Sequence, residues 1–190
     1  MVMELRRRKR YKVRMVSVEL PPAFWGFDES VKMLGNKRAN MAPAGLPTVA
    51  AMLPEEHFEV LPIIDLRIEP LTDKQIQAVD IVMFSGMIVQ REALEREMAR
   101  VKCFDKTIVI GGPYATAYRD QVLAFGAADY LVLDEAEVTL GPWVEDFLAG
   151  RAVKVYDEKS VKERITIGLT REGKPVLTQT PTPRWDLLKL

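Results

Sequence analysis

The run Thr107-Ile108-Val109-Ile110-Gly111-Gly112-Pro113 constrains the fold more than any other part of this 190-residue sequence. Four β-branched residues in succession are typical of a strand buried on both faces, as in parallel sheets. Two glycines and a proline follow, which predicts that the strand ends in a turn whose backbone stays open to a ligand. Open parallel sheets bind ligands at the carboxyl ends of their strands. The segment therefore predicts both the type of sheet and the edge that carries a site.

The rest of the chain repeats this pattern of an apolar strand followed by an amphipathic helix. Further strands are predicted at 11–20, 58–66, 80–87 and 129–135, with helices between them. Strands that alternate with helices indicate an α/β fold with a doubly wound parallel sheet. We expect a flavodoxin-like (Rossmann-like) sheet of five strands in the order 2-1-3-4-5. This order is favoured because Pro62 would place the second strand at an edge.

The segment after Gly150 has a different pattern. Short strands are predicted at 152–156 and 164–170, and a turn at 171–175 precedes another apolar stretch, which indicates a β-hairpin. Pro181-Thr182-Pro183 is typical of an extended linker. We therefore divide the chain into a basic tail (1–11), an α/β domain (12–150) and a hairpin extension with linker (151–190). The unusually long segment from Ala23 to Ala44 is expected to carry function.

Charge and composition exclude several classes of function. The chain has 27 basic and 27 acidic residues, so it lacks the basic field of a nucleic-acid-binding protein. One cysteine and one histidine exclude an internal disulfide and argue against a zinc site or a catalytic triad. Cys103 is expected to be a small core residue. No apolar run reaches the roughly 18 residues of a membrane helix, and we expect a cytoplasmic protein.

Several strand ends meet at one edge of the predicted sheet. The segments Ser85-Gly86-Met87 and Gly111–Thr116 would lie together there, and Glu135 to Glu137 follow the fifth strand. Neither a dinucleotide-binding G-x-G-x-x-G after the first strand nor a P-loop is present. Two purely structural interpretations stay open: the glycines could be turn residues only, and the carboxylates could be solvated charges at a helix start.

An ordered set of motifs resembles the B12-binding domain at the amino end of cobalamin-dependent radical S-adenosylmethionine (SAM) enzymes. The matching pieces are Pro43–Pro54, Val60–Asp65, Asp80–Met87, Val109–Thr116, Ala128–Val132 and Asp134–Glu137. Pro183–Leu188 is similar to the connector that leads such proteins into their radical domain.

The resemblance implies that the chain binds cobalamin at the carboxyl edge of the sheet. The residues implied as cofactor-binding are Ser85, Gly86, Met87, Gly111, Gly112, Pro113, Tyr114, Glu135, Ala136, Glu137 and Leu46. The D-x-H-x-x-G motif, whose histidine ligates cobalt, is absent, and His57 lies before the second strand. Cobalamin would therefore be held base-off, without a protein histidine on cobalt.

The resemblance also implies that this chain is one part of a longer enzyme. The C-x-x-x-C-x-x-C motif for an iron–sulfur cluster is absent, so SAM and a [4Fe–4S] cluster would belong to a covalently linked radical domain of a methyltransferase or cyclase. No catalytic residue, metal ligand, nucleic acid or membrane is expected here. Two alternatives remain: a flavin- or nucleotide-binding module of the same fold, and a non-catalytic interaction domain that uses Phe24, Trp25 and Phe27.

Overall fold

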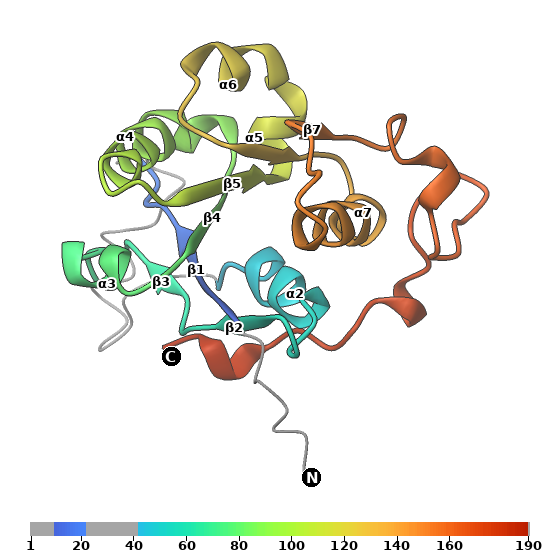
Figure 1. Cartoon of the computed structure of the whole chain (residues 1–190), viewed down its shortest axis with the longest axis horizontal. Helices are drawn as coiled ribbons and strands as arrows, with labels where there is room; N and C mark the ends of the chain where they lie inside the picture. Colours follow the sequence, from blue (N-terminus) through green and yellow to red (C-terminus); the bar gives the residue numbers. More distant parts are fainter. Residues whose placement is uncertain (1–9, 22–41, 190) are drawn as a thin grey trace, which may run out of the picture.

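The computed structural model describes residues 10–21 and 42–189. Most of the basic tail and most of the long predicted loop, with Phe24, Trp25 and Phe27, lie outside the described residues. The described chain forms a parallel sheet with helices on both faces (Figure 1). This is the doubly wound α/β architecture that the sequence predicts.

The sheet is built from strands that all run in the same direction. The strands are β1 (Tyr11–Ser17), β2 (Phe58–Val60), β3 (Ile64–Asp65), β4 (Ile81–Ser85), β5 (Thr107–Gly111), β6 (Tyr130–Val132) and β7 (Val155–Tyr156). The α-helices are α2 (Gly45–Met52), α3 (Asp73–Gln77), α4 (Arg91–Lys102), α5 (Gly112–Ala117), α6 (Arg119–Phe125) and α7 (Ala136–Leu148). Short 3₁₀ turns are η2 (Ile88–Gln90), η3 (Lys162–Arg164), η4 (Leu177–Gln179) and η5 (Trp185–Leu187).

The predicted strand order is confirmed, and proline explains how its edge is built. The order is β2-β1-β4-β5-β6-β7, with β3 also paired to β1. The predicted strand at 58–66 is interrupted at Pro62, so it contacts β1 as two separate pieces, β2 and β3. Proline has no N–H to donate to a ladder, which is why it is tolerated at this edge. The carbonyl of Pro62 instead accepts a 2.6 Å hydrogen bond from Arg14 Nη1.

The other edge differs from the prediction. The strand expected at 152–156 as part of the extension instead joins the main sheet as β7, parallel to β6. The hairpin itself is reduced to one antiparallel bridge between Leu169 and Pro175. Val155 and Tyr156 bury their side chains against the sheet or α7, and this tertiary burial is not visible in a two-residue strand pattern.

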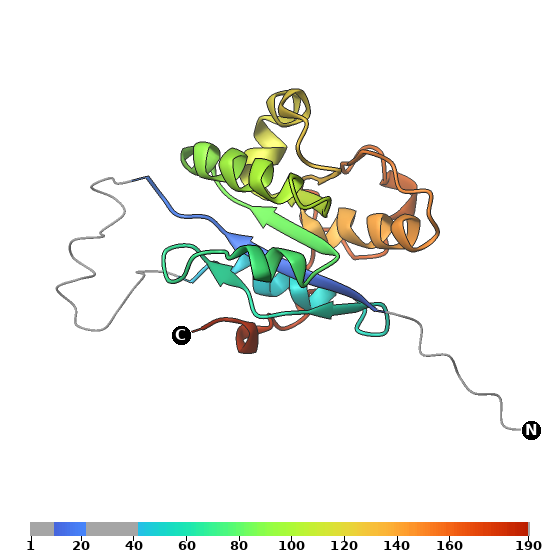
Figure 2. The same ribbon diagram turned by 60° about the vertical axis from the view of Figure 1, so that its left-hand side comes forward.

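Each face of the sheet is covered by its own layer of helices (Figures 1 and 2). Side chains such as Val16, Phe84 and Ile110 pack with α3, α4 and α6. On the opposite face, Met15 and Met83 pack with α2 and α7, whose Trp143 is completely buried. This alternation along each strand follows from the two-residue period of β-structure.

Two helix ends carry residues that are typical of helix caps. Thr72 forms a capping box with Gln75 at the start of α3, and Gly126 has φ +76° after α6. The prediction for Cys103 is wrong: this residue is exposed and caps the carboxyl end of α4. It follows the last full turn of the helix, so it lies beyond the buried stripe that ends at Val101.

The extension after β7 crosses the molecule and returns to the β2 edge (Figure 1). Leu187 is buried there, and its carbonyl accepts a 2.8 Å hydrogen bond from the Ile63 N–H. Among the described residues, no helix combines the length and apolar character that a membrane span requires.

Candidate functional site

The ends of the three central strands lie level at one edge of the sheet. Ser85 pairs with Ser17 on one side and with Gly111 on the other. The Tyr114 N–H donates a 2.9 Å hydrogen bond to the Gly86 carbonyl, which joins the first turn of α5 to the turn after β4. The structure therefore brings together the two segments that the sequence places at a binding edge.

The glycines of this edge are required by close packing of the protein against itself. A Cβ at Gly112 would stand 2.2 Å from Ser85 Oγ, and φ of Gly112 is +81°. A Cβ at Gly111 would stand 2.6 Å from the Val132 carbonyl oxygen, and one at Gly86 would stand 2.9 Å from Leu94 Cδ1. The predicted open turn is instead the start of α5, and the side on which L side chains would stand is filled by protein atoms.

Gln90 fixes the turn after β4, and sequence reasoning missed it. Its Nε2 donates a 2.6 Å hydrogen bond to the Val18 carbonyl, just beyond β1. Its Oε1 accepts a 2.9 Å hydrogen bond from the Met87 N–H. Gln90 is only 9% exposed, and a buried amide with both ends satisfied holds its neighbours in one arrangement. The sole sequence signal was a glutamine in an apolar stretch, since its partner Val18 lies 72 residues away.

We call Gln90 with its two hydrogen bonds the Gln90 clamp. The surface beside it is apolar and carries one hydroxyl. Met87, Ile88 and Val89 are 47%, 41% and 55% exposed, and they follow one another at the end of β4. The Ser85 hydroxyl is half-buried next to them and forms no hydrogen bond with any residue of the described part of the chain. An apolar surface with a single available hydroxyl can bind an aromatic ligand that carries a hydrogen-bond acceptor.

Two residues predicted at the site have side chains in the core. Leu46 is 5% exposed and packs between α2 and the sheet. Tyr114 is 1% exposed, and its hydroxyl donates a 2.9 Å hydrogen bond to Glu95 Oε1 on α4. Burial and this carboxylate raise the pKa of Tyr114 to about 12. At Tyr114, the backbone is therefore the part nearest the edge, whereas Pro113 beside it is exposed.

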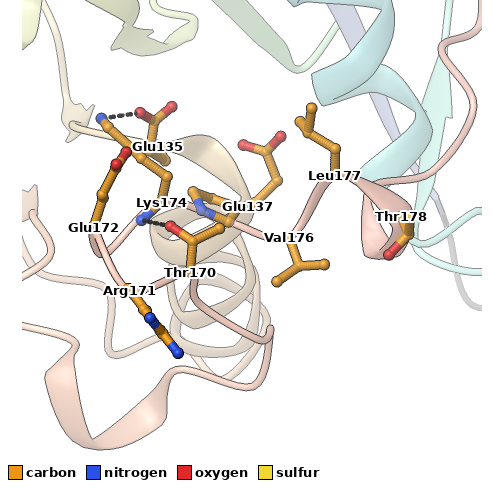
Figure 3. Close-up of a pocket in the computed structure, with 10 residues that line it drawn as sticks. Glu135, Glu137, Thr170, Arg171, Glu172, Lys174, Val176, Leu177 and Thr178 are labelled. Carbon is orange, nitrogen blue, oxygen red and sulfur yellow. Dashed lines mark hydrogen bonds and ion pairs between the residues drawn. The ribbon is translucent and has the colours of Figure 1, made fainter.

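Two of the acidic residues after β6, Glu135 and Glu137, line a cavity at the same edge. Asp134 has φ +61°, and its N–H donates a 2.9 Å hydrogen bond to Thr116 Oγ1 at the end of α5. Glu135 and Glu137, at the start of α7, face residues 170–178 of the extension across a cavity of about 690 Å³ (Figure 3). Lys174 from the extension forms an ion pair with Glu135.

The single histidine lies at the opposite edge. His57 precedes β2, and its carbonyl accepts a hydrogen bond from Tyr11, the first residue of β1. It therefore stands at the amino ends of the strands, away from Ser85 and Gly112. Within residues 10–21 and 42–189, no three His, Cys, Asp or Glu side chains are grouped so that they could hold a metal ion.

Comparison with known proteins agrees with this architecture. Residues 31–141 match the family model of the B12 binding domain. The chain is 36% identical over 172 residues to an uncharacterized methyltransferase of Synechocystis sp., covering 90% of this chain and 28% of that protein. It is 28% identical over 165 residues to hopanoid C-2 methylase of Rhodopseudomonas palustris, covering 87% of this chain and 29% of that protein.

The chain thus spans less than a third of the length of these two curated relatives. Among solved structures, it is similar to the N-terminal domain of a hypothetical protein of Thermotoga maritima, with 25% identity and a TM-score of 0.38, covering 47% of this chain and 73% of the other. The family match covers more than half of the chain and includes every strand from β2 to β6. The chain belongs to the B12-binding domain family.

Proposed function

We propose that this chain holds cobalamin base-off at the carboxyl edge of its sheet, as the cofactor module of a B12-dependent radical SAM methyltransferase or cyclase. The observation that carries the proposal is the family match over residues 31–141, placed on a fold whose strand ends meet at one edge. Both curated relatives are named as methyl-transferring enzymes and are longer than this chain. The domain division at residues 12–150 and 151–190 and the cytoplasmic location belong to the same proposal.

The nucleotide tail is assigned to the surface beside the β4 turn. Ser85 would donate its hydroxyl hydrogen to a ring nitrogen of the tail, and Met87 would cover the ring with apolar surface. The backbone at Gly86, Gly111 and Gly112 would form the floor, which Gln90 holds in place. Pro113, Ala136 and the two glutamates of α7 are assigned to the rim.

Cobalt would carry no histidine from this chain, because His57 lies at the amino edge of the sheet. When it is bound, cobalamin supplies a cobalt centre that can carry a methyl group. The residues described here bind and orient the cofactor, and the remaining chemistry belongs to a linked domain that holds SAM and a [4Fe–4S] cluster.

The test is a mixture of the purified chain with stoichiometric hydroxocobalamin. We expect a base-off visible spectrum and co-elution of cobalamin with protein on gel filtration. No retained cobalamin, or a yellow flavin that copurifies instead, would contradict the proposal.

A matched pair of variants tests the assigned surface. Met87→Glu places a charge on a residue that is 47% exposed beside Ser85 and should weaken binding. Val153→Glu makes the same kind of change on a residue that is 57% exposed before β7, at the amino edge, and should bind as the wild type does. Equal affinities of the two variants for cobalamin would contradict the assignment of the nucleotide tail to this surface.

A further inference from the structure

The extension is fastened to the domain at both ends of α7. Arg164, at the end of η3, donates hydrogen bonds of 2.6 Å to Asp146 and 2.7 Å to Glu145 near the carboxyl end of the helix. Asp146 is 7% exposed and also accepts a 3.0 Å hydrogen bond from the Tyr156 hydroxyl. At the other end, Thr180 Oγ1 lies 3.3 Å from Glu137 Oε1. The extension is therefore held in a defined place on the domain.

Between these two sets of contacts with α7, the extension forms one wall of the cavity at the start of that helix (Figure 3). Internal hydrogen bonds keep that wall in shape: Thr170 N–H donates to the Lys174 carbonyl at 2.7 Å, and Val176 N–H to the Gly168 carbonyl at 2.9 Å. The volume of about 690 Å³ lies within the range of small-molecule sites. The lining residue Glu135 follows Asp134, whose N–H donates a hydrogen bond to Thr116 Oγ1 on α5, so the cavity lies beyond the carboxyl end of β6.

The lining combines carboxylates, cationic side chains, hydroxyls and apolar side chains. It contains three carboxylates and two cationic side chains, so its formal charge is negative by one and does not favour a phosphate. Carboxylates and threonine hydroxyls accept hydrogen bonds from amide N–H groups. Beside them, Leu177 is 81% exposed, a large apolar side chain that a ligand with apolar surface would cover.

We propose that this cavity receives the amide-bearing edge of the corrin ring, with residues 170–178 of the extension as its outer wall. This inference rests on the proposed function and adds a contact surface outside the sheet. The corrin periphery carries neutral amide side chains between methyl groups, which matches carboxylate and hydroxyl acceptors set beside Val176 and Leu177. The extension thus takes part in cofactor binding as well as linking two domains.

The test compares two ligands that differ only in the tail. Hydroxocobalamin and cobinamide share the corrin ring, but cobinamide lacks the benzimidazole nucleotide. Leu177→Glu adds charge at an exposed position, so the fold is expected to stay intact, and Val153→Glu is the control at the amino edge. Dissociation constants are measured by visible titration of the 190-residue chain, and hydrogen exchange follows the amides of residues 170–178.

We expect Leu177→Glu to weaken the binding of both ligands by the same factor, about tenfold or more, since the variant loses the apolar contact with the ring and places a charge there. Val153→Glu should match the wild type, and cobinamide should protect the amides of residues 170–178 from exchange. Wild-type affinity in Leu177→Glu, or an effect on hydroxocobalamin alone, would overturn the inference and leave the proposed function in place. If the wild type binds neither ligand, the proposed function itself fails.

Discussion

Replacing Gly112 by alanine is expected to destabilise the domain through two separable effects. The first is backbone strain, because φ is +81° and an L side chain in that region costs about 1–2 kcal/mol. The second is overlap, because the new Cβ would stand 2.2 Å from Ser85 Oγ. Overpacking of this kind costs about 1–3 kcal/mol. The expected loss of unfolding free energy is therefore about 2–5 kcal/mol.

Two further variants separate these effects. Gly150 has φ +67°, and no atom lies within 4 Å of the place that a Cβ would take, so Gly150→Ala should show strain alone, about 1–2 kcal/mol. Ser85→Ala removes the hydroxyl that Gly112→Ala would meet and leaves Ser85 Cβ at 3.4 Å, an ordinary contact. In the double variant Ser85→Ala/Gly112→Ala, the overlap should disappear and only the strain should remain.

The assay is equilibrium urea unfolding at pH 7 for the wild type, the single variants and the double variant. A favourable coupling of about 1–3 kcal/mol between positions 85 and 112 is expected, since contacting residues are not additive. Strict additivity would refute the reasoning, because it would mean that Ser85 Oγ does not point at Gly112.

The remaining predictions concern two buried polar side chains and pH. Gln90→Glu keeps both hydrogen bonds only while the new carboxyl is protonated, so affinity for hydroxocobalamin should fall about tenfold as the pH rises from 5 to 8, since a buried unsatisfied group costs about 1–3 kcal/mol. The wild type and the exposed control Gln121→Glu should show no such slope across that pH range, and a flat profile for Gln90→Glu would contradict the clamp. Hydrogen bonding to Arg164 holds the pKa of Asp146 below its ordinary value of 3.8. This carboxylate therefore stabilises the fold at neutral pH, and its contribution is lost as the pH falls through the lowered pKa. The difference in unfolding free energy between the wild type and Asp146→Asn should shrink between pH 5 and pH 2, and a difference that stays constant would contradict this account.

The sheet could be predicted from the sequence because its strands are buried on both faces and carry long apolar runs. The position of the second strand followed from Pro62 alone, since a missing N–H is tolerated only at an edge or a break. The short strand β7 could not be assigned to the sheet in this way. Its two residues are placed by contacts with β6 and α7, and no local pattern contains those contacts.

The sequence predicted which strand ends lie together, but it did not predict how they pack. Register brings Ser85 and Gly111 together, as the strand order required. The glycines, however, are required by close packing inside the protein, and the side chain of Tyr114 is buried in the core. The Gln90 clamp joins residues 72 positions apart, and the outer wall comes from the extension. Such contacts between distant segments leave no periodic signal in a sequence.

The most direct test of the central claim is a crystal structure of this chain grown with hydroxocobalamin. The account predicts a corrin ring over the ends of β4, β5 and β6, a tail beside Ser85 and Met87, and no histidine on cobalt. A corrin ring bound elsewhere, or cobalt coordinated by His57 at the amino edge, would contradict it.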